Sequence, residues 1–329
     1  MVLIMKRIDK TNIGEILEKT RSSFHKDYYA MYSTVYDGIV TDPVLMMVPV
    51  DDHMVHRGDG IFETFKCVNG CIYNMKAHLE RLEHSASGLY YKLPFSLEQI
   101  GEIVVETVRA GGRKDCLIRL FVSRGPGSFD VNPYDCPGPQ LYVVSTFLKK
   151  PFMDVHPDGA VVRTSHIPVK EPFFAAIKNC NYLPNVLMKK EAVDLKADFV
   201  AAFDGRGFLA EGATENLGVV TKKRELLFPR LESILCGTTM MRISDIAETL
   251  VREGLLSRVG FGDISRHDIL NAIEVLVVGT SPNVVTVREF DGVRIGDGKT
   301  GPVQRRLNDL LVDDILNNQK LLTPVQGLC

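Results

Sequence analysis

Short apolar segments separated by Asp-Gly and Asn-Gly pairs constrain the fold of this chain more than any other feature. Asp37-Gly38, Asn69-Gly70 and Asp204-Gly205 each lie between segments rich in β-branched and aromatic residues. Such pairs favour the positive φ angles of tight hairpin turns, so each predicts two adjacent antiparallel strands. The longest apolar runs, residues 43–50 and 274–279, have the length of strands and not of membrane spans. With no signal peptide recognised, we expect a cytoplasmic protein that does not bind membranes.

Segments with helical spacing of apolar residues alternate with these strands. They are NIGEILEKTRSSF, KAHLERLEHSASGL, GTTMMRISDIAETLVREG and GPVQRRLNDLLVDDIL. A charged, Pro-containing stretch at residues 148–159 is the candidate interdomain linker. The sequence therefore predicts a mixed α+β and α/β protein. It would have an N-terminal helical extension (residues 1–31), a small α+β domain (32–150) and a larger β-rich domain with helices (151–329).

The charges, cysteines and histidines argue against several classes of function. The net charge is −2 over 329 residues and both signs are mixed along the chain, so nucleic-acid binding has little electrostatic support. The seven cysteines are scattered without a CxxC pair, which favours reduced thiols over a zinc site. His53 and His56 lack further ligands, so we expect no bound metal. Gly298-Lys299-Thr300 resembles the end of a P-loop, but Val293 occupies the position of the required glycine.

Several scattered polar residues match the requirements of one cofactor, pyridoxal phosphate. This aldehyde needs a lysine that can bind it covalently, and Lys178 in the stretch IKNCNYLPNVL is the candidate. Tyr182 could donate to the phenolic oxygen. Glu211, where a strand enters a glycine turn, could face the pyridine nitrogen. Taken singly, these residues have plainer explanations as surface charges and a core aromatic.

The phosphate of this cofactor requires backbone N–H groups, hydroxyls and a cation. Gly237, Thr238 and Thr239 open a predicted helix, whose free N–H groups and positive dipole end favour an anion. Gly279-Thr280-Ser281 ends an apolar strand and offers a second Gly-Thr turn. Arg81, on a predicted helix, could form a bidentate contact with a phosphate. A Gly-Thr pair before a helix can also be an ordinary helix cap.

The order of these segments resembles the class IV aminotransferases, which are pyridoxal-phosphate enzymes of fold type IV. The likeness is carried by HRGDGIFETFKCVNG…HLERL, IKNCNYLPNVLMKKEA, GFLAEGATENLGVV, ILCGTTMMRI and VVGTSPNVVTV, which extend over residues 32–312. It implies a two-domain fold, pyridoxal 5'-phosphate as cofactor and a homodimer whose subunits complete each other's substrate pockets. One departure is Thr238, because the family usually has Gly-Ile-Thr at this position. The cofactor contacts that the resemblance implies are Arg81, Lys178, Tyr182, Glu211, Gly237, Thr238, Thr239 and Thr280.

The resemblance implies a reaction more clearly than a substrate. A transaminase would move an amino group between an amino acid, either branched-chain L- or D-, and a 2-oxo acid. The alternatives are 4-amino-4-deoxychorismate lyase and a cofactor-binding protein without turnover. Phe129 and Val131 replace the Arg and His that trap the substrate carboxylate in bacterial D-amino-acid transaminases, and YAMYSTVYDGIVTDP resembles the plant-type group, which lacks that trap. Phe62, Arg124 and Ser281 are the expected substrate contacts, with a structural ion pair as the alternative for Arg124.

Overall fold

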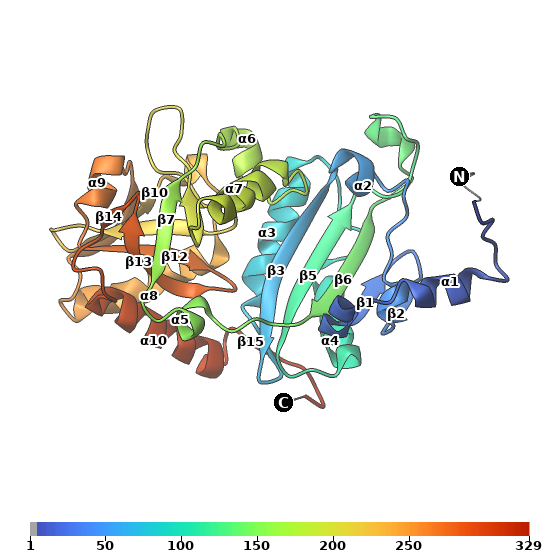
Figure 1. Ribbon diagram of the computed structural model, residues 1–329. Coiled ribbons are helices and arrows are strands. Elements are labelled where there is room, and N and C mark those ends of the chain that lie inside the picture. Colours follow the sequence, from blue (N-terminus) through green and yellow to red (C-terminus); the bar gives the residue numbers. More distant parts are fainter. Residues whose placement is uncertain (1–4, 329) are drawn as a thin grey trace.

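The computed structural model describes residues 5–328 and forms two lobes, each built around its own β-sheet (Figure 1). The lobes correspond in order to the predicted small α+β domain and the larger β-rich domain. The first four residues of the predicted extension lie outside the described residues, as does Cys329, one of the predicted reduced thiols.

The first lobe is an antiparallel sheet with helices packed on one face. Its strands are β1 (Tyr28–Ser33), β2 (Gly38–Val40), β3 (Gly60–Val68), β4 (Cys71–Tyr73), β5 (Cys116–Ser123), β6 (Gln140–Thr146) and β15 (Leu322–Pro324). They pair in the order β15-β4-β3-β5-β6-β1-β2. The helices are α2 (His53–Arg57), α3 (Met75–Gly88) and α4 (Leu97–Gly111). Phe65, Leu82, Ile100 and Ile118 are buried in the core that α3 and α4 form with the sheet.

Local sequence signals explain how the elements of this lobe begin and end. Asn69 and Gly70 adopt φ angles of 51° and 80° between β3 and β4, as a two-residue hairpin turn requires. Helix α4 starts with a capping box, in which the Ser96 hydroxyl accepts from the Gln99 N–H and the Gln99 side chain accepts from the Ser96 N–H. It ends at Gly112, which has a φ of 64°. The hairpin predicted at Asp37-Gly38 is also confirmed by the pairing of β1 and β2, although its turn is formed by residues 34–37 and Gly38 already pairs with Ser33.

The N-terminal extension is shorter than predicted. It contains α1 (Ile13–Lys19) and a 3-10 turn at Ser23–Asp27, after which β1 begins at Tyr28. The residues from Tyr28 to Met31 therefore belong to the first sheet, because β1 pairs with β6 through contacts such as Met31 opposite Val144.

The second lobe contains a mixed sheet covered by helices. Its strands are β7 (Ala160–Thr164), β8 (Phe199–Ala201), β9 (Asn216–Val220), β10 (Glu225–Pro229), β11 (Arg258–Gly262), β12 (Glu274–Gly279), β13 (Asn283–Phe290) and β14 (Val293–Arg294). The order is β11-β10-β9-β12-β13-β7-β8, and β14 pairs with β13. The helices are α5 (Phe152–Val155), α6 (Pro172–Ala175), α7 (Leu183–Asp194), α8 (Thr238–Arg252), α9 (Arg266–Leu270) and α10 (Pro302–Asn317). Three apolar clusters form the core, and α8 and α10 contribute to one of them.

Two details of this lobe differ from the sequence-based expectation. The turn at Asp204-Gly205 is longer than a two-residue hairpin, because the Asp204 N–H donates to the Phe208 carbonyl at 2.8 Å and the positive φ of 83° falls on Gly207. Strand β15 joins the first sheet by pairing with β4, although residues 151–329 were predicted to form the second domain. The end of the chain therefore ties the two lobes together.

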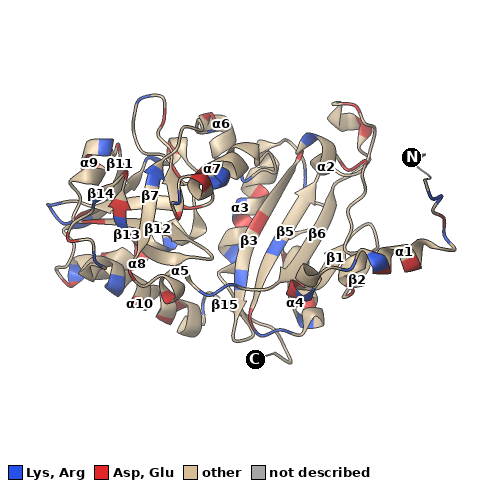
Figure 2. Ribbon diagram, in the orientation of Figure 1, with Lys and Arg blue, Asp and Glu red and all other residues tan. Residues whose placement is uncertain are grey.

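Charges of both signs are distributed over both lobes (Figure 2). Within residues 5–328, no helix has the length and apolar character needed to span a membrane.

Candidate active site

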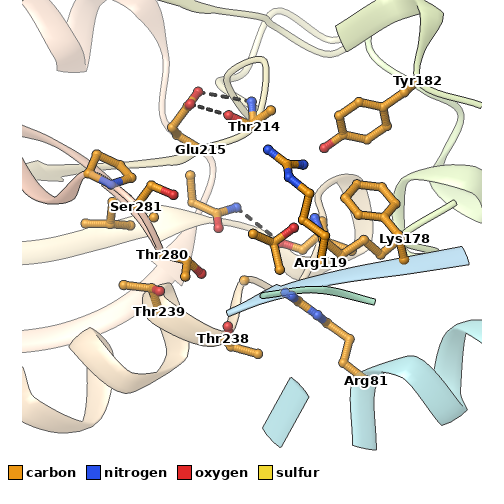
Figure 3. Close-up of a pocket in the computed structure, with 18 residues that line it drawn as sticks. Arg81, Arg119, Lys178, Tyr182, Thr214, Glu215, Thr238, Thr239, Thr280 and Ser281 are labelled. Carbon is orange, nitrogen blue, oxygen red and sulfur yellow. Dashed lines mark hydrogen bonds between the residues drawn. The ribbon is translucent and has the colours of Figure 1, made fainter. Parts of the chain in front are cut away.

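A cavity of ≈ 190 Å³ lies where the two lobes meet (Figure 3). Side chains from β3, β5 and α3 reach it from the first lobe. The 178–182 segment, the start of α8 and the turn after β12 reach it from the second. The predicted residues that line it are Phe62, Arg81, Lys178, Tyr182, Gly237, Thr238, Thr239, Thr280 and Ser281.

Lys178 is held at the cavity by backbone pairing with β3. The Phe62 N–H donates to the Lys178 carbonyl at 3.0 Å, and the Cys180 N–H donates to the Gly60 carbonyl at 2.8 Å. Strand β5 pairs with one edge of β3 along its length, whereas β4 pairs on the other edge only near its end. Residues 178–180 occupy the part of this second edge that β4 leaves unpaired. The Lys178 Nζ lies 4.4 Å from the centre of the Phe62 ring.

The surroundings of Lys178 make its amine easier to deprotonate. Burial and the nearby charge of Arg81 lower the pKa of Lys178 to about 8, against the opposing effect of Glu63 and Glu211. A substantial fraction of the side chain is then a neutral amine near physiological pH. This is the form that can attack an aldehyde or accept a proton.

Arg81 takes part in a buried network that the sequence analysis missed. Its Nε and one terminal nitrogen each donate to Glu63 at 2.7 Å, and its other terminal nitrogen donates to the Cys236 carbonyl at 3.0 Å. His78 Nδ1 lies 2.7 Å from the same carboxylate, and its Nε2 lies 3.2 Å from the Thr238 hydroxyl. A glutamate within the otherwise largely apolar segment GIFETFKCV was the signal that could have indicated this network.

Glu63 is ionised within this network although it is fully buried. Burial alone would raise its pKa, but the Arg81 guanidinium and the bond from His78 hold the pKa of Glu63 at about 2. Burial lowers the pKa of His78, so this histidine is neutral at physiological pH, donates from Nδ1 to Glu63 and accepts at Nε2 from Thr238. The network thus fixes both Arg81 and the first residue of α8.

The start of α8 has the form of an anion site. Gly237 caps the helix without a side-chain hydrogen bond, and the first N–H groups of a helix have no partner within it. A Cβ on Gly237 would lie 2.0 Å from the Asn216 Oδ1, so a side chain here would displace Asn216, whose Nδ2 donates to the Leu235 carbonyl at 3.1 Å. The hydroxyls of Thr238, Thr239 and Thr280 gather at this end of the cavity, and Lys178 and Tyr182 lie at the other (Figure 3).

Glu211 lies behind the main cavity, in an adjoining small cavity that it shares with Lys178 and Tyr182. The Leu235 N–H donates to its carboxylate at 3.2 Å, and burial raises the pKa of Glu211. A second carboxylate, that of Glu215, lines the main cavity and accepts hydrogen bonds from the N–H and hydroxyl of its neighbour Thr214. Glu215 was not among the site residues predicted from the sequence.

The structure does not bring Arg124 to the cavity, although the sequence suggested it as a substrate contact. Its guanidinium donates to Asp59 at 2.9 and 3.2 Å and lies 4.4 Å from the centre of the Tyr91 ring. Arg124 therefore forms a structural ion pair with Asp59, which was the alternative prediction for this residue. Arg119 on β5 lines the cavity instead, with an exposed side chain that points between Thr214 and Tyr182 (Figure 3).

The loop that carries Phe129 and Val131 leaves both side chains exposed, at 61% and 72%. Neither lines the cavity. Within residues 5–328, no group of three or more His, Cys, Asp or Glu side chains is placed to hold a metal ion.

Comparisons with known proteins identify the family. The sequence profile described as "Amino-transferase class IV" matches residues 60–290. The "D-amino-acid transaminase, chloroplastic" of Arabidopsis thaliana is 40% identical over 305 residues, which cover 92% of this chain and 80% of that protein. A "putative branched-chain-amino-acid aminotransferase" of Methanocaldococcus jannaschii is 30% identical over 266 residues, covering 81% and 90%. The crystal structure of the T.th. branched-chain amino acid aminotransferase with pyridoxamine 5'-phosphate has a TM-score of 0.84 at 26% identity, covering 91% of this chain and 99% of that one.

The chain therefore belongs to the class IV aminotransferases and is a transaminase that uses pyridoxal phosphate. The predicted family, fold type and cofactor are confirmed. The cavity fits this cofactor chemically, because it has an amine of lowered pKa at one end and, at the other, hydroxyls at a helix start without a side-chain cap. The comparisons support transamination and give no support to the lyase alternative.

We predict that Glu63→Gln removes part of the pH dependence of stability. The folded-state pKa of Glu63, about 2, is below the ordinary value of 4.5, so its contribution is present above about pH 4.5 and is lost as the pH falls toward 2. From pH 5 to pH 3, the wild type should lose about 2 kcal/mol more of its free energy of unfolding than the variant. Urea unfolding of the cofactor-free protein measures this difference.

The matched control is Glu289→Gln, because Glu289 forms a surface ion pair with Arg163 at 2.7 Å. Its stability should follow the wild-type pH dependence. Equal slopes in Glu63→Gln and the wild type would show that folding does not lower the pKa of Glu63.

Proposed function

We propose that this protein is a transaminase of D-amino acids. The observation that carries the proposal is its 40% identity, over 92% of its length, to the D-amino-acid transaminase of Arabidopsis thaliana. Phe129 and Val131, expected at the positions of the Arg and His of the bacterial carboxylate trap, argue against a bacterial type of D-alanine pocket and are compatible with the plant-type group. The second candidate is transamination of branched-chain L-amino acids, supported by the TM-score of 0.84 to an enzyme of that name.

In this proposal, Lys178 is the residue that binds the cofactor and moves the proton. When bound, pyridoxal phosphate draws electron density away from the α-carbon of the amino acid, which makes the proton there removable. Lys178 Nζ would take that proton from the α-carbon and deliver it to the cofactor carbon that carries the amino nitrogen, and a pKa of about 8 suits a base that works near neutral pH.

The neighbouring residues hold the pyridine ring and its charges. Glu211 keeps a proton at the pyridine nitrogen, and its place next to Lys178 and Tyr182 supports this role. Tyr182 donates to the phenolic oxygen, because burial and the charge of Glu211 raise the pKa of Tyr182 and keep its hydroxyl protonated. Arg81, Thr238, Thr239 and Thr280 hold the phosphate at the other end.

The test of the function compares substrates and a lysine variant. The wild type should form pyruvate from D-alanine faster than it forms the oxo acid from L-leucine, with a 2-oxo acid as acceptor. Lys178→Ala should abolish both reactions and should not retain the cofactor after borohydride reduction, as read by mass spectrometry. Lys189→Ala, an exposed lysine on α7, is the control and should behave as the wild type.

Turnover of L-leucine without D-alanine would replace the D-amino-acid proposal by the branched-chain one. Full activity of Lys178→Ala would remove Lys178 from the mechanism and leave the family assignment intact.

Arg119 is the proposed partner of the substrate carboxylate. It lines both the cavity and the wider groove beside it, so its guanidinium meets a substrate that enters from that side. Phe62, whose ring stacks at 6.0 Å on that of Phe121, and Ser281 complete the proposed substrate contacts. Arg124, which is held in its pair with Asp59, has no part in this recognition.

We predict that Arg119→Met raises the KM for the amino donor at least about tenfold, because a charge-assisted hydrogen bond to the carboxylate is lost. Arg124→Met should keep the wild-type KM but unfold at a lower temperature, since it removes the guanidinium partner of the Asp59 carboxylate. Steady-state kinetics and thermal unfolding measure the two effects. An unchanged KM in Arg119→Met would exclude this role for Arg119.

The homodimer and the cytoplasmic location stay predictions. The dimer is supported by a groove of ≈ 810 Å³ on the first lobe, lined by Met31, Phe121, Val144 and Phe147 next to Arg119. A second copy that covers this groove would also close the substrate side of the cavity. The name of the Arabidopsis relative places that protein in the chloroplast.

We predict that Phe147→Asp halves the mass measured by sedimentation velocity, because it puts a charge into the proposed interface. Phe147 is 50% exposed in the single chain. Phe173→Asp is the control, because Phe173 is 52% exposed and does not line the groove. A wild-type protein that sediments as a monomer would refute the dimer.

A further inference from the structure

Lys66 is a buried ammonium group without a carboxylate partner within residues 5–328. It lies on β3 and is 6% exposed. Its Nζ donates to the Asn283 Oδ1 at 2.6 Å. Burial lowers the pKa of Lys66 to about 8. A buried charge is costly unless something pairs with it, so a lysine in this position calls for an anion nearby.

The place of Lys66 indicates which anion this is. A narrow space of ≈ 10 Å³ behind the main cavity is lined by Lys66 and by Thr238, Thr239 and Thr280. These threonines also line the main cavity. The ammonium group therefore lies on the far side of the hydroxyls that face the phosphate end.

Without Lys66, the positive charges around the three threonines are too few to neutralise a bound phosphate. The charge of Arg81 is offset by Glu63, which holds it with two hydrogen bonds of 2.7 Å. His78 is neutral, because burial lowers its pKa. A phosphate monoester carries a charge of about −1.5 to −2 at neutral pH. The start of α8 supplies only about half a positive charge.

Lys66 also reaches the turn that presents Thr280. Asn283 pairs with Gly279 at the base of this turn and adopts a φ of 61°, which Asn tolerates. Since Lys66 belongs to the first lobe and Asn283 to the second, their hydrogen bond fixes the turn relative to β3.

We propose that Lys66 is a positioning residue for the cofactor phosphate: it supplies the uncompensated positive charge beneath the threonines and holds the Thr280 turn through Asn283. The inference rests on the proposed function in one respect, namely that the end of the cavity with Thr238, Thr239 and Thr280 receives the phosphate.

The experiment compares pyridoxal 5'-phosphate with pyridoxal, which lacks the phosphate. Dissociation constants of both for the cofactor-free full chain are measured by equilibrium dialysis. Lys66→Met should reduce the preference for the phosphorylated form at least about tenfold, because one charge-assisted interaction is lost. The affinity for pyridoxal should change little. The control is Lys76→Met, at an 87% exposed lysine on α3, and it should keep the wild-type preference.

A second variant distinguishes the effect of the Lys66 charge from the structural effect of its hydrogen bond to Asn283. Asn283→Asp keeps the shape of the side chain and tolerates the same backbone angle, and it places a carboxylate against Lys66. If Lys66 acts through its charge, this variant should also lose at least about tenfold of the preference. A purely structural bridge would be kept or strengthened by the new ion pair, and the preference would stay at the wild-type value.

The possible outcomes distinguish the inference from the proposal on which it rests. A wild type without preference for the phosphorylated form would show that the threonine end does not bind the phosphate. A wild-type preference that persists in both Lys66→Met and Asn283→Asp would overturn the role of Lys66. So would an equal loss of affinity for both ligands in the two variants.

Discussion

The backbone pairing between residues 178–180 and β3 is the contact on which the rest of the site depends. Strand β4 is short and covers only the end of one edge of β3. The remaining length of that edge accepts the lysine segment from the other lobe, through hydrogen bonds that join Phe62 to Lys178 and Gly60 to Cys180. These bonds fix the position of the lysine relative to the first sheet. The cavity between the lobes therefore has a rigid wall at the point where the chemistry takes place.

Strand β3 also organises the charges of the site. It carries the buried Glu63, which is bonded to Arg81, and the buried Lys66, which lies beside Thr238, Thr239 and Thr280. Glu63 gathers Arg81 and His78 into a network in which every partner is hydrogen-bonded, which is the condition for keeping such charges out of water. Lys66 has a neutral partner, Asn283. The charge of Glu63 is therefore neutralised by Arg81, whereas the positive charge of Lys66 has no negative partner in the described part of the chain. This arrangement suits the binding of an anionic ligand.

The sequence predicted the parts of the site that depend on local chemistry. A glycine before Thr238 and Thr239 marks a helix start with free N–H groups, and the structure has this helix and its cap. The substrate side was harder, because Arg119 and Arg124 lie close together in the sequence and differ only in their surroundings. Arg119 extends from β5 toward the cavity, whereas Arg124 follows the strand and pairs with Asp59. No local pattern distinguishes these two positions.

The sequence by itself determined the Asn69-Gly70 turn, the helix starts and the order of the cofactor-binding segments. These features depend on backbone angles, capping and spacing over a few residues, as the Asn69-Gly70 turn illustrates. Only the tertiary structure decided that β15 joins the first sheet, and that Glu63 pairs with Arg81. It also decided that Lys66 is buried against Asn283, which is 217 positions away. The burial and pairing of a charge depend on which distant segments surround it, and the fold sets those neighbours.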